Sequence, residues 1–169
     1  MSHDHHHKHD AKDVHCMVVT ISDSRTFETD EGGRYLVEAL TQAGHRVSSR
    51  QIVADEVAAI RSLVLDAVES GTVDMLVLTG GTGVSVRDVT PDAVVPLLTK
   101  RLPGFGEIFR QVSYAEMGPS AILSRADAGV ITRTLVYILP GAPEGVRLAM
   151  EKLILPTLPN AIGLLRRHA

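Results

Sequence analysis

The first half of this chain alternates between short, unbroken apolar runs and longer stretches in which apolar residues recur at helical spacing. Residues 16–21, 46–53 and 73–78 have the length and β-branched character of strands, the second being less apolar and so nearer a sheet edge. Residues 33–43 and 56–69 repeat apolar positions every three to four residues, which predicts helices buried along one face. The predicted order is therefore strand, helix, strand, helix, strand.

The second half is interrupted more often by proline and glycine, and its predicted elements are shorter. The pattern predicts two short helices, two strands and two C-terminal helices, at 92–99, 107–116, 129–132, 134–139, 144–153 and 160–167. Pro103-Gly104-Phe105-Gly106 should separate the first two helices, and Pro156 with Pro159 the last two.

Alternating strands and helices with short connections are typical of an open, mainly parallel sheet covered by helices on both faces, so we expect a three-layer α-β-α fold. Crossover connections in such sheets are almost always right-handed, and the carboxyl ends of the parallel strands meet at one edge. Ligands of these folds bind outside that edge. The loops that carry Asp23, Asp55 and residues 80–88 should therefore approach one crevice.

Composition narrows the class of protein. Apolar residues make up 44% and charged residues 22% of the 169 residues, which is ordinary for a globular protein. The net charge of −3 leaves no basic footprint and aromatic residues are few, so nucleic acid is not expected as a partner. The single cysteine, Cys16, cannot form an internal disulfide and is interpreted as a buried thiol in a reducing compartment. We therefore expect a cytoplasmic location.

The N-terminus differs in composition from the rest of the chain. Five of the eight histidines lie in residues 1–9, within a low-complexity arm that ends at Asp13. Such a tract can bind metal, but a disordered tail or a cloning remnant has the same composition. We interpret residues 1–13 as an arm and residues 14–169 as one α/β domain that is long enough to form a core. No apolar run approaches the roughly 20 residues that span a bilayer, so no membrane contact is expected.

The candidate chemistry follows the third predicted strand. Thr79-Gly80-Gly81-Thr82-Gly83 has three glycines in four positions, and glycine lets main-chain N–H groups approach a ligand closely. Consecutive exposed N–H groups can form a cradle for anions such as phosphate. Arg87 and Asp88 come next, and Thr90-Pro91 has the form of a helix start with Thr90 as N-cap. A turn that only lets the chain fold back closely is the structural alternative.

Two common phosphate-binding motifs do not match this loop. A Walker-type loop needs a lysine after the glycines, and none is present. A dinucleotide-binding loop needs a third glycine at the position of Val86. A phosphate site here would therefore be of another kind.

Asp55 and Asp88 are the candidate metal ligands, because Mg²⁺ prefers one or two carboxylates together with phosphate oxygens and water. Each has a simpler alternative. Asp55 stands where a strand gives way to a helix and could cap that helix. Asp88 could form a surface ion pair with Arg87. Two carboxylates beside a glycine cradle suit a magnesium triphosphate, whose transfer reactions need positioning and charge neutralisation more than a side-chain nucleophile.

Residues 79–83, followed by Arg87-Asp88-Val89-Thr90-Pro91, closely resemble the signature of the MoaB/Mog family of molybdenum cofactor biosynthesis proteins. Further likeness covers residues 16–158 and includes Thr20-Ile21-Ser22-Asp23, Pro103-Gly104-Phe105-Gly106, Leu123-Ser124-Arg125 and Pro140-Gly141. The family includes molybdopterin adenylyltransferases, which transfer AMP from Mg-ATP to molybdopterin and release pyrophosphate. Its members are trimers or hexamers, and the resemblance also admits a downstream molybdenum-insertion enzyme as a partner.

The resemblance also implies roles for single residues. Asp55 and Asp88 match functional aspartates of the family, with Ala54 where proline is common, and would be catalytic and bind Mg²⁺. Ser124 matches another site position. Further contacts with molybdopterin or ATP are implied for Ser22, Asp23, Thr79, Gly80, Gly81, Thr82, Gly83, Ser113, Pro140, Gly141 and Pro143.

Two other functions stay open. The Phe105–Arg110 segment looks like that of the MoaB branch, for which a molybdopterin-binding or scaffold protein without turnover is the rival reading. The presence of all five residues 87–91 favours the enzyme. A nucleotide pyrophosphatase of the competence-damage type would carry a Thr-Gly-Gly-Leu-Gly-Pro-Thr-like loop, which residues 82–86 do not match.

Overall fold

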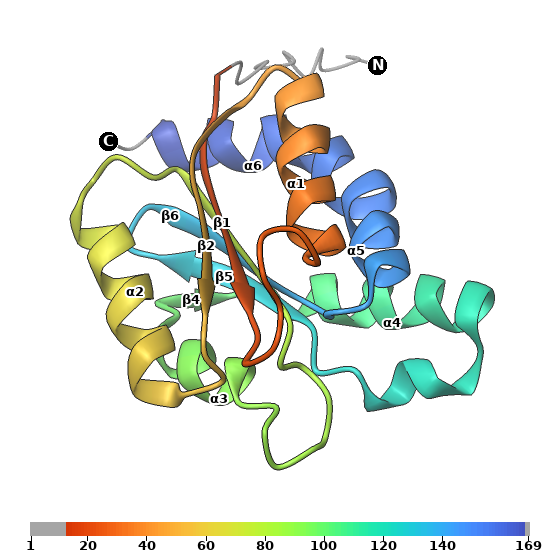
Figure 1. Ribbon diagram of the computed structural model, residues 1–169. Helices are drawn as coiled ribbons and strands as arrows, with labels where there is room; N and C mark the ends of the chain where they lie inside the picture. The colour runs from red at the N-terminus through yellow and green to blue at the C-terminus, as the bar shows by residue number, and fades with distance from the viewer. Residues whose placement is uncertain (1–12, 168–169) are drawn as a thin grey trace, which may run out of the picture.

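The structure is a computed structural model that describes residues 13–167, so nearly all of the predicted histidine-rich arm lies outside the described residues. The elements in chain order are β1 (His15–Ile21), α1 (Glu31–Gln42), β2 (Arg46–Val53), α2 (Val57–Glu69), β3 (Met75–Thr79), α3 (Thr90–Val94), β4 (Lys100–Arg101), α4 (Pro103–Met117), β5 (Asp127–Ile131), β6 (Thr134–Leu139), α5 (Pro143–Ala149) and α6 (Leu155–Arg166). Short 3-10 turns, η1 (Val95–Leu97) and η2 (Pro119–Leu123), follow α3 and α4. Figure 1 shows their arrangement.

The six strands form one sheet in the order β2-β1-β3-β6-β5-β4. β1 pairs in parallel with β2 and β3, and β3 pairs in parallel with β6, whereas β5 runs antiparallel to both of its neighbours. The predicted open, mainly parallel sheet is therefore confirmed, and the least apolar of the first three strands, β2, is an edge strand as expected.

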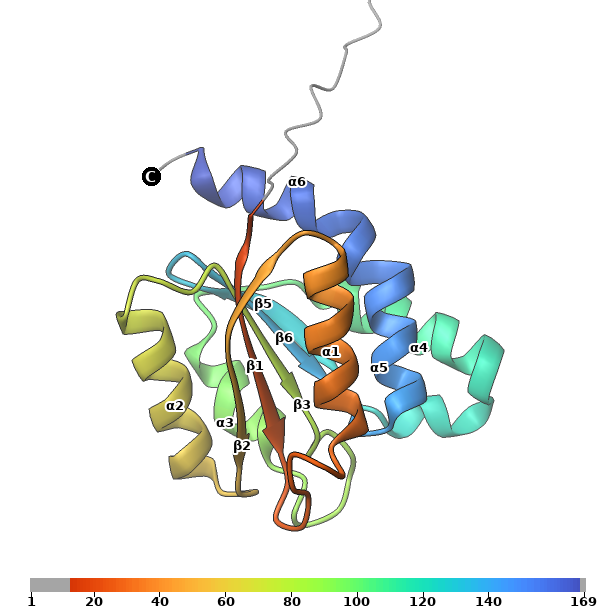
Figure 2. The same cartoon turned by 45° about the horizontal axis from the view of Figure 1, so that its top comes forward.

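Alternate side chains of the central strands enter two separate cores. Cys16, Val18 and Val77 pack with α1, α4, α5 and α6 on one face, while Val19, Leu76 and Leu78 pack with α2 and α3 on the other. Figure 2 shows α1 and α5 on one side of the sheet and α2 on the opposite side. The three-layer α-β-α prediction is thus confirmed.

The segment after β3 departs most from the predicted pattern. The helix predicted at 92–99 covers only Thr90–Val94 and continues as the 3-10 turn η1, which contains Pro96, a residue without the N–H that an α-helix needs. Residues 100 and 101 then form β4, which no pattern indicated. Pro103 lies in the first turn of α4, where a missing N–H is tolerated, so the predicted break at 103–106 is instead the start of a helix.

Pro156 and Pro159 do not divide the C-terminal helix as predicted. A π turn at Met150–Ile154 joins α5 to α6, and the Leu155 N–H donates to the Met150 carbonyl five residues earlier. This local change of hydrogen-bond register precedes Pro156, which cannot donate to a carbonyl four residues back, and the helix continues.

The resulting helix, Pro143–Arg166, is the one segment among residues 13–167 that is long and apolar enough to cross a membrane, with a mean hydropathy of 1.2 over 18 residues. The prediction that no apolar stretch reaches this length is therefore wrong. A core helix of a globular protein meets the same criteria, so the finding is weak evidence for a membrane contact. Val146, Met150 and Ile154 of this helix are fully buried in the core beside the sheet.

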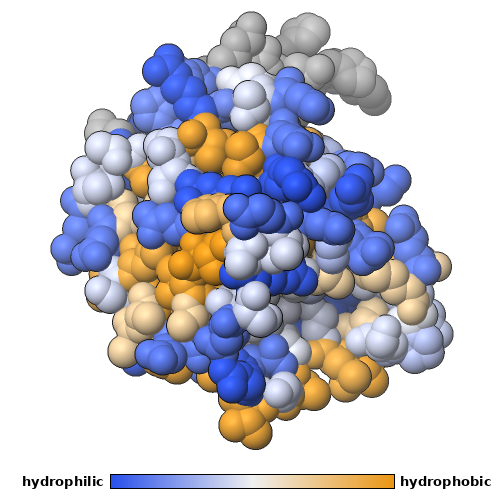
Figure 3. All heavy atoms as spheres, in the orientation of Figure 1, coloured by the Kyte–Doolittle hydropathy of each residue, from blue (hydrophilic) through white to orange (hydrophobic). Residues whose placement is uncertain are grey.

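The edge strand β2 leaves part of the sheet uncovered. Figure 3 shows apolar residues gathered over β2 and α2. A hollow of about 580 Å³ lies there, lined by apolar side chains such as Val53 and Leu63 and by hydroxyls such as Ser48.

Asp30 is the N-cap of α1 and joins this helix to β1 and β2. The helix begins at Glu31, two residues before its predicted start at Gly33. Its buried carboxylate caps α1 by accepting the Gly33 N–H at 2.9 Å, and it also accepts the Thr20 hydroxyl of β1 at 2.7 Å and Arg50 Nη2 of β2 at 2.9 Å. Burial by itself raises the pKa of Asp30, but these hydrogen bonds and the Arg50 charge outweigh it and hold the pKa below its ordinary value.

Replacing Asp30 with asparagine should destabilise the fold by about 3 kcal/mol near neutral pH, because it leaves the Arg50 charge without its buried partner. Since the folded-state pKa of Asp30 is lowered, its contribution is complete above the ordinary aspartate pKa and is lost as the pH falls through the lowered value. Urea unfolding followed by circular dichroism across this range measures both effects.

Glu38→Gln on the exposed face of α1 is the control, and it should change the free energy of unfolding by less than about 0.5 kcal/mol. Equal stability of Asp30→Asn and wild type near neutral pH would show that the carboxylate does not hold these elements together.

Candidate functional site

Loops from four parallel strands meet at one edge of the sheet, below the arrowheads of β1 and β3 in Figure 2. Ser22 and Asp23 follow β1, and Asp55 follows β2. The Asp55 N–H donates to Asp23 Oδ1 at 3.1 Å, which ties these two loops together. The third loop, residues 80–89, follows β3, and Pro140 and Gly141 follow β6.

Glycine is required at the base of the third loop. Gly80 and Gly81 have φ angles of +106° and +65°, which residues with a side chain rarely adopt. A Cβ on Gly80 would collide with the Ile21 carbonyl oxygen, and one on Gly81 would collide with Thr90 Oγ1. A Cβ on Gly141 would lie 3.4 Å from the Gly80 Cα, so the loops after β3 and β6 are in close contact.

The carbonyl groups of residues 80–83 are all engaged by the protein. Gly80 O accepts the Thr90 hydroxyl at 2.7 Å, and Gly81 O accepts the Thr90 N–H at 3.0 Å. Thr82 O accepts the Arg125 N–H at 2.8 Å, and Gly83 O accepts Arg125 Nε at 2.8 Å. Thr90 is thus the first residue of α3, and its hydroxyl does not cap the helix as predicted.

The N–H groups on the other side of the same peptides have no such partner. Within residues 13–167, the amides of Gly81, Thr82, Gly83 and Val84 donate no hydrogen bond to another protein group. In a trans peptide the N–H points away from the carbonyl, so carbonyls held against the protein turn these amides outward. Four consecutive free amides are an arrangement suited to binding the oxygens of an anion.

Asp55 lies beside these amides with its carboxylate unused. The N-cap of α2 is Glu56, so the helix-cap alternative for Asp55 is wrong. Asp55 Oδ1 is 3.1 Å from the position that a Cβ on Gly81 would occupy. Burial raises the pKa of Asp55, and the negative charge of Asp88 raises it further. The two carboxylates are therefore near enough to repel each other.

Asp88 closes the tip of the loop. Its Oδ2 accepts the Ser85 N–H at 2.9 Å, and its own N–H donates to Ser85 O at 3.0 Å. Arg87 does not pair with Asp88, as the alternative proposed, but forms an ion pair with Asp23. The ion pair spans the loops after β1 and β3, and among residues 13–167 Asp88 forms no ion pair with a cationic side chain.

The two carboxylates have the composition of a magnesium–phosphate site. No group of three or more metal-ligating side chains exists among the described residues, so at this site the described side chains alone do not enclose a metal. Mg²⁺ commonly takes one or two carboxylates and completes its shell with phosphate oxygens and water. The mutual repulsion of Asp55 and Asp88, and the free amides beside them, fit that use.

Several other predicted site residues use their side chains within the protein. Ser22 Oγ accepts the Arg25 N–H at 3.2 Å, and the Thr79 hydroxyl donates to Pro140 O at 2.7 Å. Ser124 Oγ accepts the Ala126 N–H at 3.3 Å. Pro143 is the first residue of α5, and Ser113 is buried in α4 with no hydrogen bond to the glycine loop in the described chain.

Two contacts with the loop were not predicted from the sequence. One is made by Arg125, and the other by Thr90, whose hydroxyl and N–H hold the carbonyls of Gly80 and Gly81. Within Leu123-Ser124-Arg125 the serine was chosen, yet the arginine makes the contacts with the loop. The signal in the sequence is the cationic Arg125 directly after Ser124, within a motif that already indicated the site.

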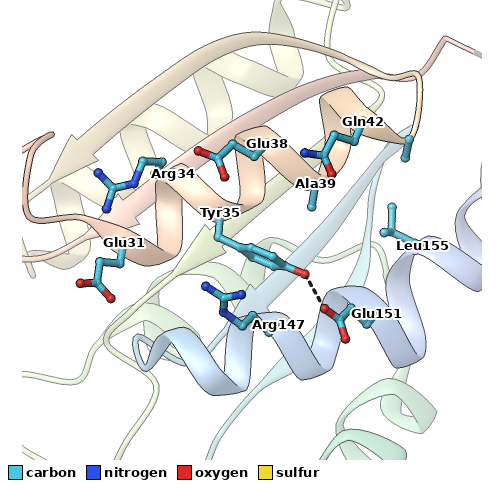
Figure 4. A pocket seen from close by; sticks show the side chains of 10 residues that line it. Glu31, Arg34, Tyr35, Glu38, Ala39, Gln42, Arg147, Glu151 and Leu155 are labelled. Atoms are coloured by element: carbon cyan, nitrogen blue, oxygen red, sulfur yellow. Dashed lines mark hydrogen bonds between the residues drawn. The ribbon is translucent and has the colours of Figure 1, made fainter.

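A hollow away from the strand ends has a different character. About 610 Å³ in volume, it lies between α1 and α5, as Figure 4 shows. The Tyr35 hydroxyl donates to Glu151 there at 3.1 Å, and the Arg147 guanidinium lies 4.6 Å from the Tyr35 ring centre. The hollow is lined by charged groups of both signs, and two of them, Arg147 and Glu151, contact Tyr35. It therefore differs from the strand ends, where amides and two carboxylates come together.

Known proteins share this fold. Residues 17–160 match the family described as a probable molybdopterin binding domain. Molybdenum cofactor biosynthesis protein B of Bacillus subtilis is 47% identical over 163 residues, covering 95% of this chain and 96% of that protein. A crystal structure of a molybdenum cofactor biosynthesis protein B is 50% identical, with a TM-score of 0.89, and covers 92% of this chain and 98% of that one. The tungsten cofactor synthesizing protein MoaB from Pyrococcus furiosus is 32% identical, with a TM-score of 0.83, and covers 92% and 99%.

The fold and the family match thus place the chain in the class of α/β proteins with a molybdopterin-binding type of domain. The chain belongs to the MoaB/Mog family of molybdenum cofactor biosynthesis proteins, as the sequence motifs predicted.

Replacing Asp55 with asparagine should stabilise the protein near neutral pH, because it removes a half-buried charge that Asp88 repels. Since the folded-state pKa is raised, the gain is complete above that pKa and disappears as the pH falls to the ordinary aspartate value, where the carboxyl is protonated in both states. Urea unfolding of both proteins across this range measures the difference.

The matched control is Asp66→Asn, on the exposed side of α2, which should show no such pH-dependent gain. A loss of stability in Asp55→Asn would mean that the carboxylate has a favourable partner in the fold.

Proposed function

We propose that this protein catalyses the Mg-ATP-dependent adenylylation of molybdopterin, forming adenylated molybdopterin and pyrophosphate. The observation that carries the proposal is the meeting of four free amides with two carboxylates that lack a cationic partner. Such groups are retained at a cost to stability, and sites that bind a ligand are where proteins commonly keep them. Membership of a molybdenum cofactor biosynthesis family supports the choice of substrate.

In this proposal the amides of Gly81–Val84 bind phosphate oxygens of ATP and stabilise the negative charge that grows on the departing pyrophosphate. Asp55 and Asp88 would bind Mg²⁺, which neutralises the phosphate oxygens when it is present. The Arg87–Asp23 ion pair holds the loop after β3 against the loop after β1, and Asp23 also accepts the Asp55 N–H. These contacts help to position both carboxylates.

The reaction balances without a nucleophile from the protein. An oxygen of the terminal phosphate of molybdopterin forms a bond to the α-phosphorus of ATP, the bond from that phosphorus to the β-phosphate oxygen breaks, and pyrophosphate leaves with the electron pair. The attacking oxygen is already anionic, so no general base is needed. The protein contributes alignment and charge stabilisation, which dominate catalysis of phosphoryl-type transfer.

The alternative is a protein that binds molybdopterin without turnover. One observation favours it: the relatives that match over nearly the whole chain are named for their role in cofactor biosynthesis, and not for a transferase reaction. The same glycine loop would then hold only the phosphate of the pterin. A trimeric or hexameric assembly and a cytoplasmic location stay predictions under either function.

Product analysis after incubation with Mg-ATP and freshly released molybdopterin tests the proposal. Wild type should form adenylated molybdopterin and pyrophosphate, and Asp88→Asn should lose at least about 100-fold in rate, a size typical of losing a group that stabilises the transition state. The substitution is matched in shape, because the asparagine oxygen can still accept the Ser85 N–H and hold the loop.

Pterin binding measured on the same samples separates the two functions. Retained binding by Asp88→Asn together with lost turnover supports catalysis. Pterin binding by wild type without any AMP transfer would reject the adenylyltransferase and leave the binding protein.

A further inference from the structure

Arg125 lies in the segment after η2, and its side chain contacts the loop after β3 at two points, Gly83 and Asp88. Its Nε donates to Gly83 O at 2.8 Å and its Nη2 donates to Asp88 O at 2.5 Å. Nη1 donates to the Asp92 carboxylate in the first turn of α3, at 3.0 and 3.1 Å. One guanidinium therefore connects Gly83, Asp88 and the first turn of α3.

We propose that Arg125 is a positioning residue that turns the amides of Gly83 and Val84 toward the ligand and fixes the main chain at Asp88. Its role as a phosphate-orienting group rests on the proposed function, but its control of the loop conformation does not. No direct contact with substrate is required of it.

The direction of the amides follows from the carbonyls that Arg125 holds. The main-chain N–H of Arg125 donates to the Thr82 carbonyl at 2.8 Å, and its side-chain Nε donates to the Gly83 carbonyl. Because each peptide is planar and trans, the N–H groups of Gly83 and Val84 must point to the opposite side. Thr90 sets the preceding two peptides in the same way, so Arg125 completes the row of four amides.

The main chain on either side of Arg125 is fixed by a second arginine, Arg110. Arg110 of α4 donates through Nη1 to Ser124 O at 3.3 Å and to Ala126 O at 2.9 Å, the carbonyls on either side of Arg125. The position thus has a fixed backbone, and the planar guanidinium carries its donors in a rigid fork. A lysine there keeps the positive charge but offers one flexible ammonium group, which cannot hold Gly83 O, Asp88 O and Asp92 together.

Arg125→Lys tests this inference, with Arg166→Lys as a control. Arg166 pairs with Asp74 at 2.8 Å, directly before β3 and thus at the opposite end of that strand from the loop. NMR order parameters of the backbone amides at 84–88, which the Arg125 side chain fixes through Gly83 O and Asp88 O, should be near 0.85 in wild type and in Arg166→Lys, and should fall below about 0.6 in Arg125→Lys. The dissociation constant for Mg-ATP should rise about tenfold in Arg125→Lys and stay unchanged in the control.

The outcomes separate this inference from the proposed function. Unchanged order parameters in Arg125→Lys overturn the inference, as does a mobile loop that still binds Mg-ATP with wild-type affinity. If wild type itself fails to bind Mg-ATP, the proposed adenylylation is rejected, whereas the order parameters still decide whether Arg125 sets the loop conformation. Melting temperatures of the three proteins exclude global unfolding as the cause.

Discussion

Everything at the candidate site depends on the hydrogen bonds that the protein makes to four consecutive carbonyls, those of residues 80–83. Two come from Thr90 and two from Arg125, and together they leave the four amides on the opposite side of the same peptides free. Buried or crowded backbone groups are normally paired, so a row of free amides is informative. The loop is held through its acceptors, and in the proposed function its free donors bind the phosphate oxygens.

The carboxylates of Asp55 and Asp88 are the second feature of the site. The fold places these two negative charges close enough to repel each other. The parallel strands end at one edge, which brings the loop after β2 next to the loop after β3. Asp23 accepts the Asp55 N–H and pairs with Arg87. The Asp55 carboxylate forms no hydrogen bond or ion pair within residues 13–167, and the charge of Asp88 repels it. Asp30, at the start of α1, is buried with every compensating partner and stabilises the fold. The contrast separates a structural aspartate from two that are available to a cation.

The sequence predicted the fold well because hydrophobic periodicity and strand order are local signals. The strands 46–53 and 134–139 coincide with β2 and β6, and the meeting of Asp23, Asp55 and the glycine loop followed from parallel topology alone. Pairings between distant side chains could not be predicted in this way. Nothing local shows that Arg87 selects Asp23 over its neighbour, that Arg125 holds Gly83, or that a π turn carries the helix past Pro156.

A crystal structure with Mn²⁺ and a non-hydrolysable ATP analogue would test the central claim most directly. The account predicts anomalous signal from Mn²⁺ between Asp55 and Asp88, with phosphate oxygens within hydrogen-bond distance of the amides of Gly81–Val84. Nucleotide bound elsewhere, such as between α1 and α5, or phosphates that leave these four amides unpaired, would contradict it.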